Sequence, residues 1–419
     1  MDNRQPKDAK KTVRPGFKYA MLALICLIYF TVYGFSGASI STLFTTIAPD
    51  LGWSEYQTSA VWGAIPLGLM CFTLISGMLL DKFSTKILMS VSICVGAVAI
   101  FGRGITDNFT AFYVFMFLAG LSQAISFPGN IKVITTWFEK KELFRANGFL
   151  LSSGHMGMLV GYNLTFPICD IVGGWHMMYR MIGGFILVIA VLWFVFARDK
   201  KADEVVLNRE LSANIEKMSI AQNLKLIFST RDARLIFIAE FISVGCVQTY
   251  MGFAPTVMLD VAGSTPRLAA LIASMGSLGS MIGYAVLPVI SDKVGRKKPF
   301  VWPAMIASAV FRILALQSGN FAAAGAALFA GALMDGWAIT GPRTMLQELP
   351  QIAGVRSGTA IGILNTFSRA AAALFPMIYA LLAGLLASHK NALSCVFALV
   401  VISALLMSMV KEHNIKKKA

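Results

Sequence analysis

Long apolar runs, separated by short segments that carry charges or turn-forming residues, divide this chain of 419 residues. A helix that crosses a bilayer needs about 20 mostly apolar residues, because each residue rises about 1.5 Å and the hydrocarbon core is about 30 Å thick. With 57% hydrophobic and 14% charged residues, the chain has more apolar surface than a water-soluble domain can bury. The sequence therefore predicts an all-α integral membrane protein with twelve transmembrane helices. We place them at residues 18–45, 57–80, 87–105, 110–135, 146–169, 177–197, 234–258, 268–290, 299–317, 321–345, 356–384 and 391–410.

The Lys and Arg residues are distributed very unevenly between alternate loops. If both termini are cytoplasmic, 28 of the 36 Lys and Arg fall in cytoplasmic segments and four in outer segments: Arg103, Arg180, Arg267 and Lys390. This is the asymmetry of the positive-inside rule. The formal net charge of +15 is thus a signal of topology, and we expect no nucleic-acid partner. The first apolar run is too long for the core of a signal peptide, so we expect the N-terminus to be retained.

The two halves of the chain carry matching markers. Asp81 and Asp292 each follow an apolar helix and begin a short basic loop, and they lie 211 residues apart. Arg145 and Arg356 are separated by the same interval, which is half the chain length. Such offsets predict duplication of a six-helix unit. The predicted organisation is a cytoplasmic tail (1–17), a first bundle (18–197), a cytoplasmic linker (198–233), a second bundle (234–410) and a second tail (411–419).

The two basic loops, GMLLDKFSTK (77–86) and SDKVGRKK (291–298), resemble the G-x-x-x-D-R-x-G-R-K loop of the major facilitator superfamily. The first loop has Ser84 and Thr85 in place of Gly-Arg, and the second has Pro288 in place of the leading Gly. The resemblance implies two parallel six-helix repeats, a substrate site between them near the membrane midplane, and a loop that controls gating. The gating candidates are Asp81, Lys82, Asp292, Arg296, Arg145 and Arg356.

Two further segments are similar to family members that carry organic anions and related metabolites. They are FPGNIKVITTWFEKKELFRANGF (127–149) and GGW (173–175). Met116 stands where many such members have Arg, so any role of that arginine is absent from this chain.

Polar side chains at the centre of a span point to function, because each charge there costs at least about 2.5 to 3.5 kcal/mol. Arg369 lies near the centre of the eleventh span and Asp335 near the centre of the tenth. A guanidinium can bind a carboxylate with two hydrogen bonds, and Asp335 could release Arg369 by protonation or bind a cationic group. The alternative is an ion pair between Asp335 and Arg369 that only joins two helices. The predicted substrate-binding residues are Arg369, Asp335, His155, Gln123, Gln248, Tyr250, Tyr29 and Tyr33.

Other polar and small residues in the spans have simpler interpretations. Glu240, Lys132 and Arg343 lie near cytoplasmic helix ends, where pairing at a gate or snorkelling explains them. We expect Arg312, toward the outer end of the ninth span, to reach the outer interface. The fifth and eighth spans contain GxxxG spacings, from which we expect close contact between these two helices across the halves.

These features predict a secondary active transporter that moves a small organic anion, a carboxylate, by alternating access, coupled to protons or working by exchange. The main alternative is a proton-driven exporter of amphipathic drugs, with a pocket lined by some of the 22 Met and 30 Phe. A non-transporting membrane sensor is an alternative of another class.

The sequence lacks the motifs of several other protein classes. The sequence contains no HExxH, GxSxG or phosphate-binding loop, so we predict neither an enzyme nor a nucleotide-driven pump. The six Cys occur singly without metal-ligand spacing, and we expect no metal and no cofactor. We expect a monomer in the bacterial cytoplasmic membrane, with the lipid bilayer, the anion and possible coupling protons as its partners.

Overall fold

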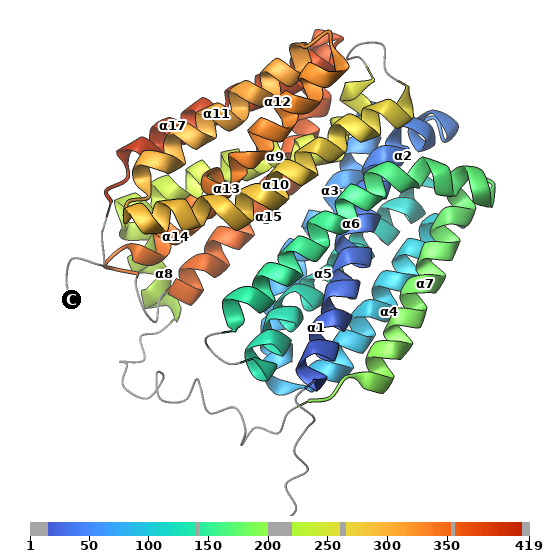
Figure 1. Cartoon of the computed structure of the whole chain (residues 1–419), viewed down its shortest axis with the longest axis horizontal. Helices are drawn as coiled ribbons and strands as arrows, with labels where there is room; N and C mark the ends of the chain where they lie inside the picture. The colour runs from blue at the N-terminus through green and yellow to red at the C-terminus, as the bar shows by residue number, and fades with distance from the viewer. Residues whose placement is uncertain (1–15, 139–141, 200–219, 260–264, 353–356, 413–419) are drawn as a thin grey trace, which may run out of the picture.

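The computed structural model describes residues 16–138, 142–199, 220–259, 265–352 and 357–412, and within these ranges the regular elements are all helices (Figure 1). η1 is a π-helix that continues α1 into α2. The elements are α1 Phe17–Ile28, η1 Tyr29–Phe35, α2 Ser36–Asp50, α3 Glu55–Lys82, α4 Thr85–Arg103, α5 Phe109–Trp137, α6 Leu143–Val172, α7 Trp175–Phe196, α8 Ile220–Ser229, α9 Arg231–Met258, α10 Pro266–Val294, α11 Lys298–Gln317, α12 Phe321–Leu333, α13 Asp335–Ala338, α14 Thr340–Glu348, α15 Ser357–Leu386, α16 His389–Ala398 and α17 Val400–Met409.

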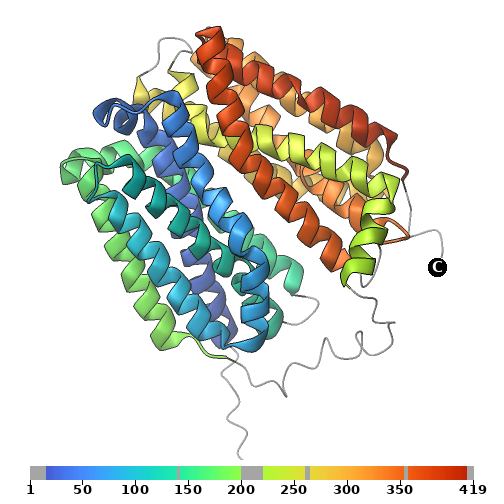
Figure 2. The same cartoon turned by 180° about the vertical axis from the view of Figure 1, so that it is seen from behind.

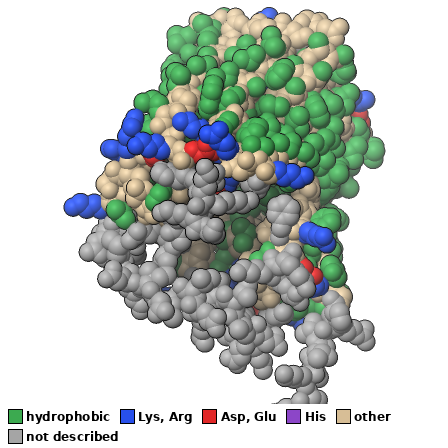
Figure 3. Space-filling view, turned by 60° about the vertical axis from the view of Figure 1, so that its left-hand side comes forward, with side chains coloured by type: hydrophobic (Ala, Val, Ile, Leu, Met, Phe, Trp, Pro, Cys, Tyr) green, Lys and Arg blue, Asp and Glu red, His purple; other side chains and the backbone are tan. Residues whose placement is uncertain are grey.

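Many of these helices are built to cross a membrane. Among the described residues, ten helical stretches are long and apolar enough to do so. Helices α3 and α6, with 28 and 30 residues, also exceed the length that a span needs. Hydrophobic side chains cover much of the face shown in Figure 3, and most visible Lys and Arg side chains lie across the middle of that view, below the broad hydrophobic region. The prediction of an all-helical membrane protein is confirmed, while the twelve-span topology stays a prediction.

The helices form two bundles, one containing α1 to α7 and the other α8 to α17 (Figures 1 and 2). Each bundle has its own buried core, with Trp193 in the first and Phe237 in the second. The bundles meet where α3 packs on α15, α6 on α10 and α2 on α9. We call the end where α1 begins and α17 ends the terminal end, and the opposite end, between α2 and α3, the far end.

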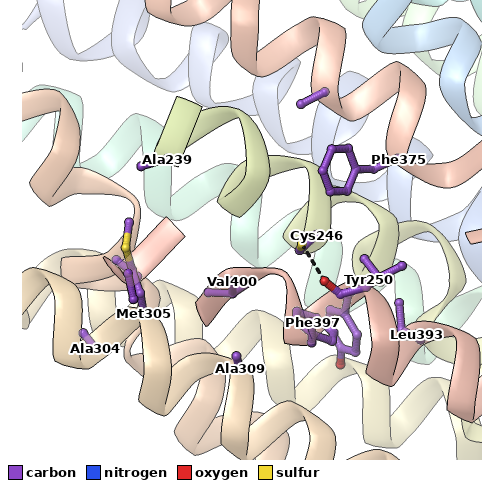
Figure 4. Close-up of a cluster of buried hydrophobic side chains, with 14 of the residues drawn as sticks. Ala239, Cys246, Tyr250, Ala304, Met305, Ala309, Phe375, Leu393, Phe397 and Val400 are labelled. Atoms are coloured by element: carbon purple, nitrogen blue, oxygen red, sulfur yellow. Dashed lines mark hydrogen bonds between the residues drawn. The ribbon is translucent and has the colours of Figure 1, made fainter. Parts of the chain in front are cut away.

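The core of the second bundle is packed around α9 (Figure 4). The Cys246 thiol donates a hydrogen bond of 3.1 Å to the carbonyl of Val396, and the Tyr250 and Phe397 rings lie 6.0 Å apart. All six cysteines lie in the described residues and are free thiols. Cys169 and Cys246 are buried and serve as small core residues, whereas Cys71 and Cys395 are exposed.

Glycines bring helices of the same half into backbone contact. A Cβ on Gly157 of α6 would lie 2.2 Å from the carbonyl oxygen of Phe30, and one on Gly283 of α10 would lie 2.2 Å from that of Leu333. The expected contact between the fifth and eighth spans across the halves is confirmed, but it does not run through these glycines. Although α6 and α10 do touch, their glycines face η1 and α12, because a helix side without side chains allows the closest approach to a neighbour in the same bundle.

Candidate functional site

A cavity lies between the two bundles and is lined from both. Its volume is about 50 Å³, room for a few water molecules at roughly 10 to 15 Å³ each. Trp62, Ile65, Pro66, Leu69 and Met158 of the first bundle, with Met251 of the second, supply most of its apolar wall. The polar lining consists of Tyr33, Gln123, Gln248 and Arg369, four of the eight residues predicted to bind substrate.

Arg369 brings the positive charge to this cavity. Its guanidinium lies 5.6 Å from the centre of the Phe127 ring, and the side chain is partly exposed. Among the described residues, no carboxylate lies within ion-pair distance of Arg369. A cation in this position attracts an anion, because few other groups nearby can compensate its charge.

Two tyrosines of the π-helix stand beside Arg369. The rings of Tyr29 and Tyr33 stack with centres 4.9 Å apart, and Phe127 packs edge-on against both. Tyr33 lines the cavity and Tyr29 lies behind it. The sequence placed both rings on the first span but not in a π-helix, a distortion that is frequent at functional sites.

Asp335 is held by Arg312 and not by Arg369. Two hydrogen bonds of 2.6 and 3.1 Å join the Arg312 guanidinium to the Asp335 carboxylate, and Ser308 and Ser280 donate further bonds at 3.0 and 3.5 Å. The expectation that Arg312 reaches the outer interface is wrong, since the residue is 1% exposed. An arginine this deep is stabilised by the carboxylate of the neighbouring helix. A substrate-binding role for Asp335 stays a prediction.

The other predicted residues lie outside the central cavity. His155 lines a separate pocket of about 60 Å³ between α6 and α10, where its ring packs against that of Tyr284. Its Nδ1 lies 3.1 Å from the carbonyl oxygen of Leu151. Tyr250 is buried beside Arg312, whose guanidinium lies 5.3 Å from the centre of its ring. Roles for His155 and Tyr250 in binding stay predictions.

The predicted gating residues that the structure describes lie at the terminal end. Lys82, Arg145 and Arg296 are exposed, and Arg296 lies 3.7 Å from Glu412. The side chains of Asp81 and Asp292, and the whole of Arg356, fall outside what the structure describes. Gating by these six residues stays a prediction. Three other charges of the spans have partners: Lys132 donates to the carbonyl of Leu80, and Arg343 pairs with Glu240 at 2.9 Å.

Three side chains of the first bundle bind backbone carbonyls of α9, and sequence reasoning missed them. Trp62 Nε1 donates to the carbonyl of Gln248 at 3.1 Å. Ser41 donates to those of Met251 and Gly252 at 2.8 Å, and Tyr162 donates to that of Met251 at 3.1 Å. We call these three side chains, together with the backbone of residues 248–252, the seal.

Local sequence explains why α9 can accept these bonds. Pro255 lacks an N-H, so the carbonyl of Met251, four residues earlier, loses its helical partner and is free to accept from Ser41 and Tyr162. A Cβ on Gly252 would lie 2.6 Å from the Trp62 indole, so only glycine allows this approach. Gly252 and Pro255 were the signal in the sequence that could have located the seal.

Further contacts close the far end. The rings of Phe44 and Phe253 stack across the halves at 5.9 Å, Arg267 pairs with Asp170, and His389 lies 3.7 Å from Glu55. Among the described residues, the hydrogen bonds and ion pairs between the halves lie from the cavity to the far end. Hydrogen bonds and ion pairs therefore join the two bundles on the side of the cavity that lies toward the far end.

A small cavity between two helical bundles of a membrane protein is the arrangement in which secondary transporters place their substrate site. The chain belongs to the major facilitator superfamily, whose family model matches residues 25–376. It is a multi-pass membrane protein, in agreement with the predicted location in a bacterial cytoplasmic membrane.

Several relatives are transporters of organic acids by name. The chain is 24% identical to the probable galactarate/D-glucarate transporter GudP of Bacillus subtilis (strain 168), over 98% of this chain and 97% of the relative. It is 20% identical to the probable sulfoacetate transporter SauU of Cupriavidus necator, over 86% of each. The 4-hydroxybenzoate transporter PcaK of Acinetobacter baylyi is 22% identical, over 71% of this chain and 70% of that protein.

Solved structures share the fold at lower identity. A bacterial homolog of the human lysosomal transporter Spinster, in an inward-facing and occupied conformation, superposes with a TM-score of 0.77 at 13% identity, covering 94% of this chain and 97% of that one. The nucleoside transporter NupG gives a TM-score of 0.73 at 13% identity, with 93% and 98% covered. At these identities the likeness concerns the fold alone.

Proposed function

We propose that this protein is a secondary transporter that moves a small organic anion, a carboxylate, across the membrane by alternating access. The observation that carries the proposal is Arg369, a partly exposed residue that lines the cavity between the bundles, with no carboxylate at ion-pair distance among the described residues. A guanidinium offers two parallel N-H donors that match the two oxygens of a carboxylate. The names of the relatives, which refer to organic acids, support the same class of substrate.

The rest of the cavity suits a polar anion. Gln123 and Gln248 supply amide groups from opposite bundles, and Tyr33 supplies a hydroxyl. A substrate bound to both bundles stabilises their approach, and its release allows them to part. Because about 50 Å³ is too small for a sugar acid, we expect the cavity to widen when the substrate enters.

The proposal includes the topology. We propose twelve spans in two six-helix repeats, residues 18–197 and 234–410, with both termini in the cytoplasm. In that orientation the seal and the ion pairs of the far end close the outer side, so the conformation is closed to the outside. Transport is coupled to protons or proceeds by exchange, and uptake with and without a pH gradient separates the two.

The test uses purified protein, a panel of small carboxylates, thermal unfolding and uptake into liposomes. We expect carboxylates to stabilise the wild-type protein. Arg369→Gln should lose this stabilisation and uptake, and Arg369→Lys, which keeps the charge without the fork, should retain part of both. Arg234→Gln, which removes an exposed arginine of α9 outside the cavity, is the matched control.

Two results would contradict the proposal. Unchanged uptake by Arg369→Gln would show that Arg369 does not bind the anion. Stabilisation by lipophilic cations and by no anion would favour the exporter of amphipathic drugs.

A further inference from the structure

The second bundle contains two ion pairs with a buried carboxylate, and the pairs differ in how many hydrogen bonds that carboxylate accepts. In the pair of Arg312 with Asp335, both side chains are almost fully buried, 2% and 1% exposed, and both carboxylate oxygens accept hydrogen bonds. In the pair of Arg343 with Glu240, the arginine side chain is 36% exposed and the glutamate is fully buried. One oxygen of Glu240, Oε2, has no hydrogen-bond partner among the described residues.

Because of this difference, Arg343 can leave Glu240 for another anion more easily than Arg312 can leave Asp335. Arg343 can reach solvent or a ligand without leaving a closed core, whereas Arg312 cannot. The carboxylate that holds Arg343 also uses only one of its two oxygens, Oε1, for the bonds of 2.9 Å to Nε and Nη2. Glu240 is therefore a less complete partner than a free carboxylate that can use both oxygens.

Arg343 lies next to the cation of the cavity. Its Nη1 donates to Asn365 Oδ1 at 3.3 Å, and Asn365 precedes Arg369 by four residues on α15. Residues four apart share one face of a helix, with Cβ atoms about 5 to 6 Å apart. The Arg343 and Arg369 side chains are close enough to interact electrostatically. The Arg343 guanidinium therefore binds α15 at a residue one helical turn before Arg369.

We propose that Arg343 is a second anion-binding group, which exchanges Glu240 for a carboxylate of the substrate, and that the substrate class is accordingly the dicarboxylates. One carboxylate binds Arg369 and the other binds Arg343. A monocarboxylate leaves Arg343 on Glu240 and gains only the first contact. The inference rests on the proposed function, because it takes Arg369 as the first anion-binding group.

When Arg343 leaves Glu240 for the substrate, the protonation of Glu240 should change. When Arg343 turns to the substrate, Glu240 remains as a buried carboxylate without its cation, which is a costly state. It therefore takes up one proton from the solvent. Besides Arg343, the polar groups of the described residues that face Glu240 are Ser368 Oγ, 3.5 Å from its Oε1, and Asn365 through Arg343. Binding of a dicarboxylate thus consumes about one proton, and binding of a monocarboxylate consumes none.

The experiment compares matched acids on the purified full chain. Pairs such as succinate with butyrate and galactarate with galactonate differ in one carboxylate. We expect the wild-type protein to bind at least one dicarboxylate about tenfold to a hundredfold more tightly than its monocarboxylate, the range for hydrogen bonds to charged groups. Because Arg343→Gln alone leaves Glu240 unpaired and is liable to misfold, the main variant is the double change Arg343→Gln with Glu240→Gln.

The double variant should bind both members of a pair equally, with the affinity for the monocarboxylate unchanged. Glu240→Gln alone should keep the preference for the dicarboxylate but lose the proton uptake, measured by a pH indicator in weak buffer. A wild-type protein that shows no preference for any dicarboxylate overturns the inference, as does a preference that survives in the double variant.

Arg369→Gln separates the two proposals. One outcome is that Arg369→Gln loses binding of both acids while the double variant keeps its preference for the dicarboxylate. That result supports the proposed function and shows only that Arg343 does not bind the substrate. Retention of both acids in Arg369→Gln contradicts the proposed function itself. Arg234→Gln again serves as the control for loss of an exposed arginine.

Discussion

The guanidinium of Arg312 holds the carboxylate of Asp335 with two hydrogen bonds, Nη2 to Oδ2 at 2.6 Å and Nη1 to Oδ1 at 3.1 Å. Arg312 belongs to α11, and Asp335 lies where the helix of the tenth span is interrupted between α12 and α13. Both side chains are sealed from solvent. The ion pair thus joins α11 to the interrupted helix of the tenth span inside the second bundle.

Removing one member of this pair should destabilise the protein strongly. We expect Asp335→Asn to cost about 3 to 5 kcal/mol, because it leaves a buried guanidinium without its counter-charge. The double change Arg312→Met with Asp335→Leu should cost much less, since it removes both charges and keeps the volume. Thermal unfolding in detergent measures both. Equal losses in the two variants would contradict this prediction, and anion affinity measured on the same samples tests the predicted substrate role of Asp335.

The seal should set the balance between the two conformations of the transporter. The combined change Ser41→Ala with Tyr162→Phe removes the donors to the carbonyls of Met251 and Gly252. At about 0.5 to 1.5 kcal/mol for each lost bond, we expect the conformation open at the far end to gain population by about fivefold or more. Pulsed electron paramagnetic resonance between spin labels on the exposed residues Ile171 and Leu271, in a cysteine-free background, reports this opening.

The control for the seal is Ser229→Ala, whose hydroxyl bonds only to a carbonyl of its own helix. Unchanged distance distributions in the seal variant would mean that these hydrogen bonds do not hold the far end closed.

A methyl group at Gly157 should prevent native packing of the first bundle. Its Cβ would lie 2.2 Å from the carbonyl oxygen of Phe30, so α6 and η1 must separate, at a cost of at least about 1 to 3 kcal/mol. Gly184→Ala is the matched control, because nothing lies within 4 Å of its Cβ and alanine favours a helix. We expect a clear fall in thermal stability for Gly157→Ala and none for the control. Similar behaviour of the two variants would argue against the close contact.

The two glutamines of the cavity should contribute modestly to affinity. Gln123→Ala or Gln248→Ala each removes one amide, for which we expect binding to weaken about twofold to tenfold in titrations with the anion. Tyr250→Phe should weaken binding less than either glutamine change does, because Tyr250 is buried beside Arg312 outside the cavity. A larger effect from Tyr250 than from either glutamine would contradict the placement of the site.

The sequence predicts how deep a residue lies in the membrane, but it does not predict which side of its helix the residue faces. Arg369, Gln123 and Gln248 could be found by counting residues from the ends of apolar runs, because depth in the membrane follows from the rise of a helix. The partner of Asp335 could not be found in this way. Arg312 and Arg369 both lie in spans, and only the rotation of each helix decides which one faces the carboxylate.

The seal escaped prediction for another reason. Ser41, Trp62 and Tyr162 bind carbonyl groups, which every residue has, so the acceptor side leaves no trace in the side-chain pattern. Only Pro255, which frees the carbonyl of Met251, marks the place. Helix rotation and backbone acceptors are tertiary information, whereas span number and depth are local.

Because the seal uses the main chain of α9, its strength is largely independent of the side chains that α9 presents. Gln248 and Met251 contribute carbonyls to the seal and side chains to the cavity wall. If the proposed function holds, substitutions at these two positions change which solute is preferred and leave the hydrogen bonds of the seal in place. Related chains could thus differ in substrate and still keep the same hydrogen bonds between the bundles.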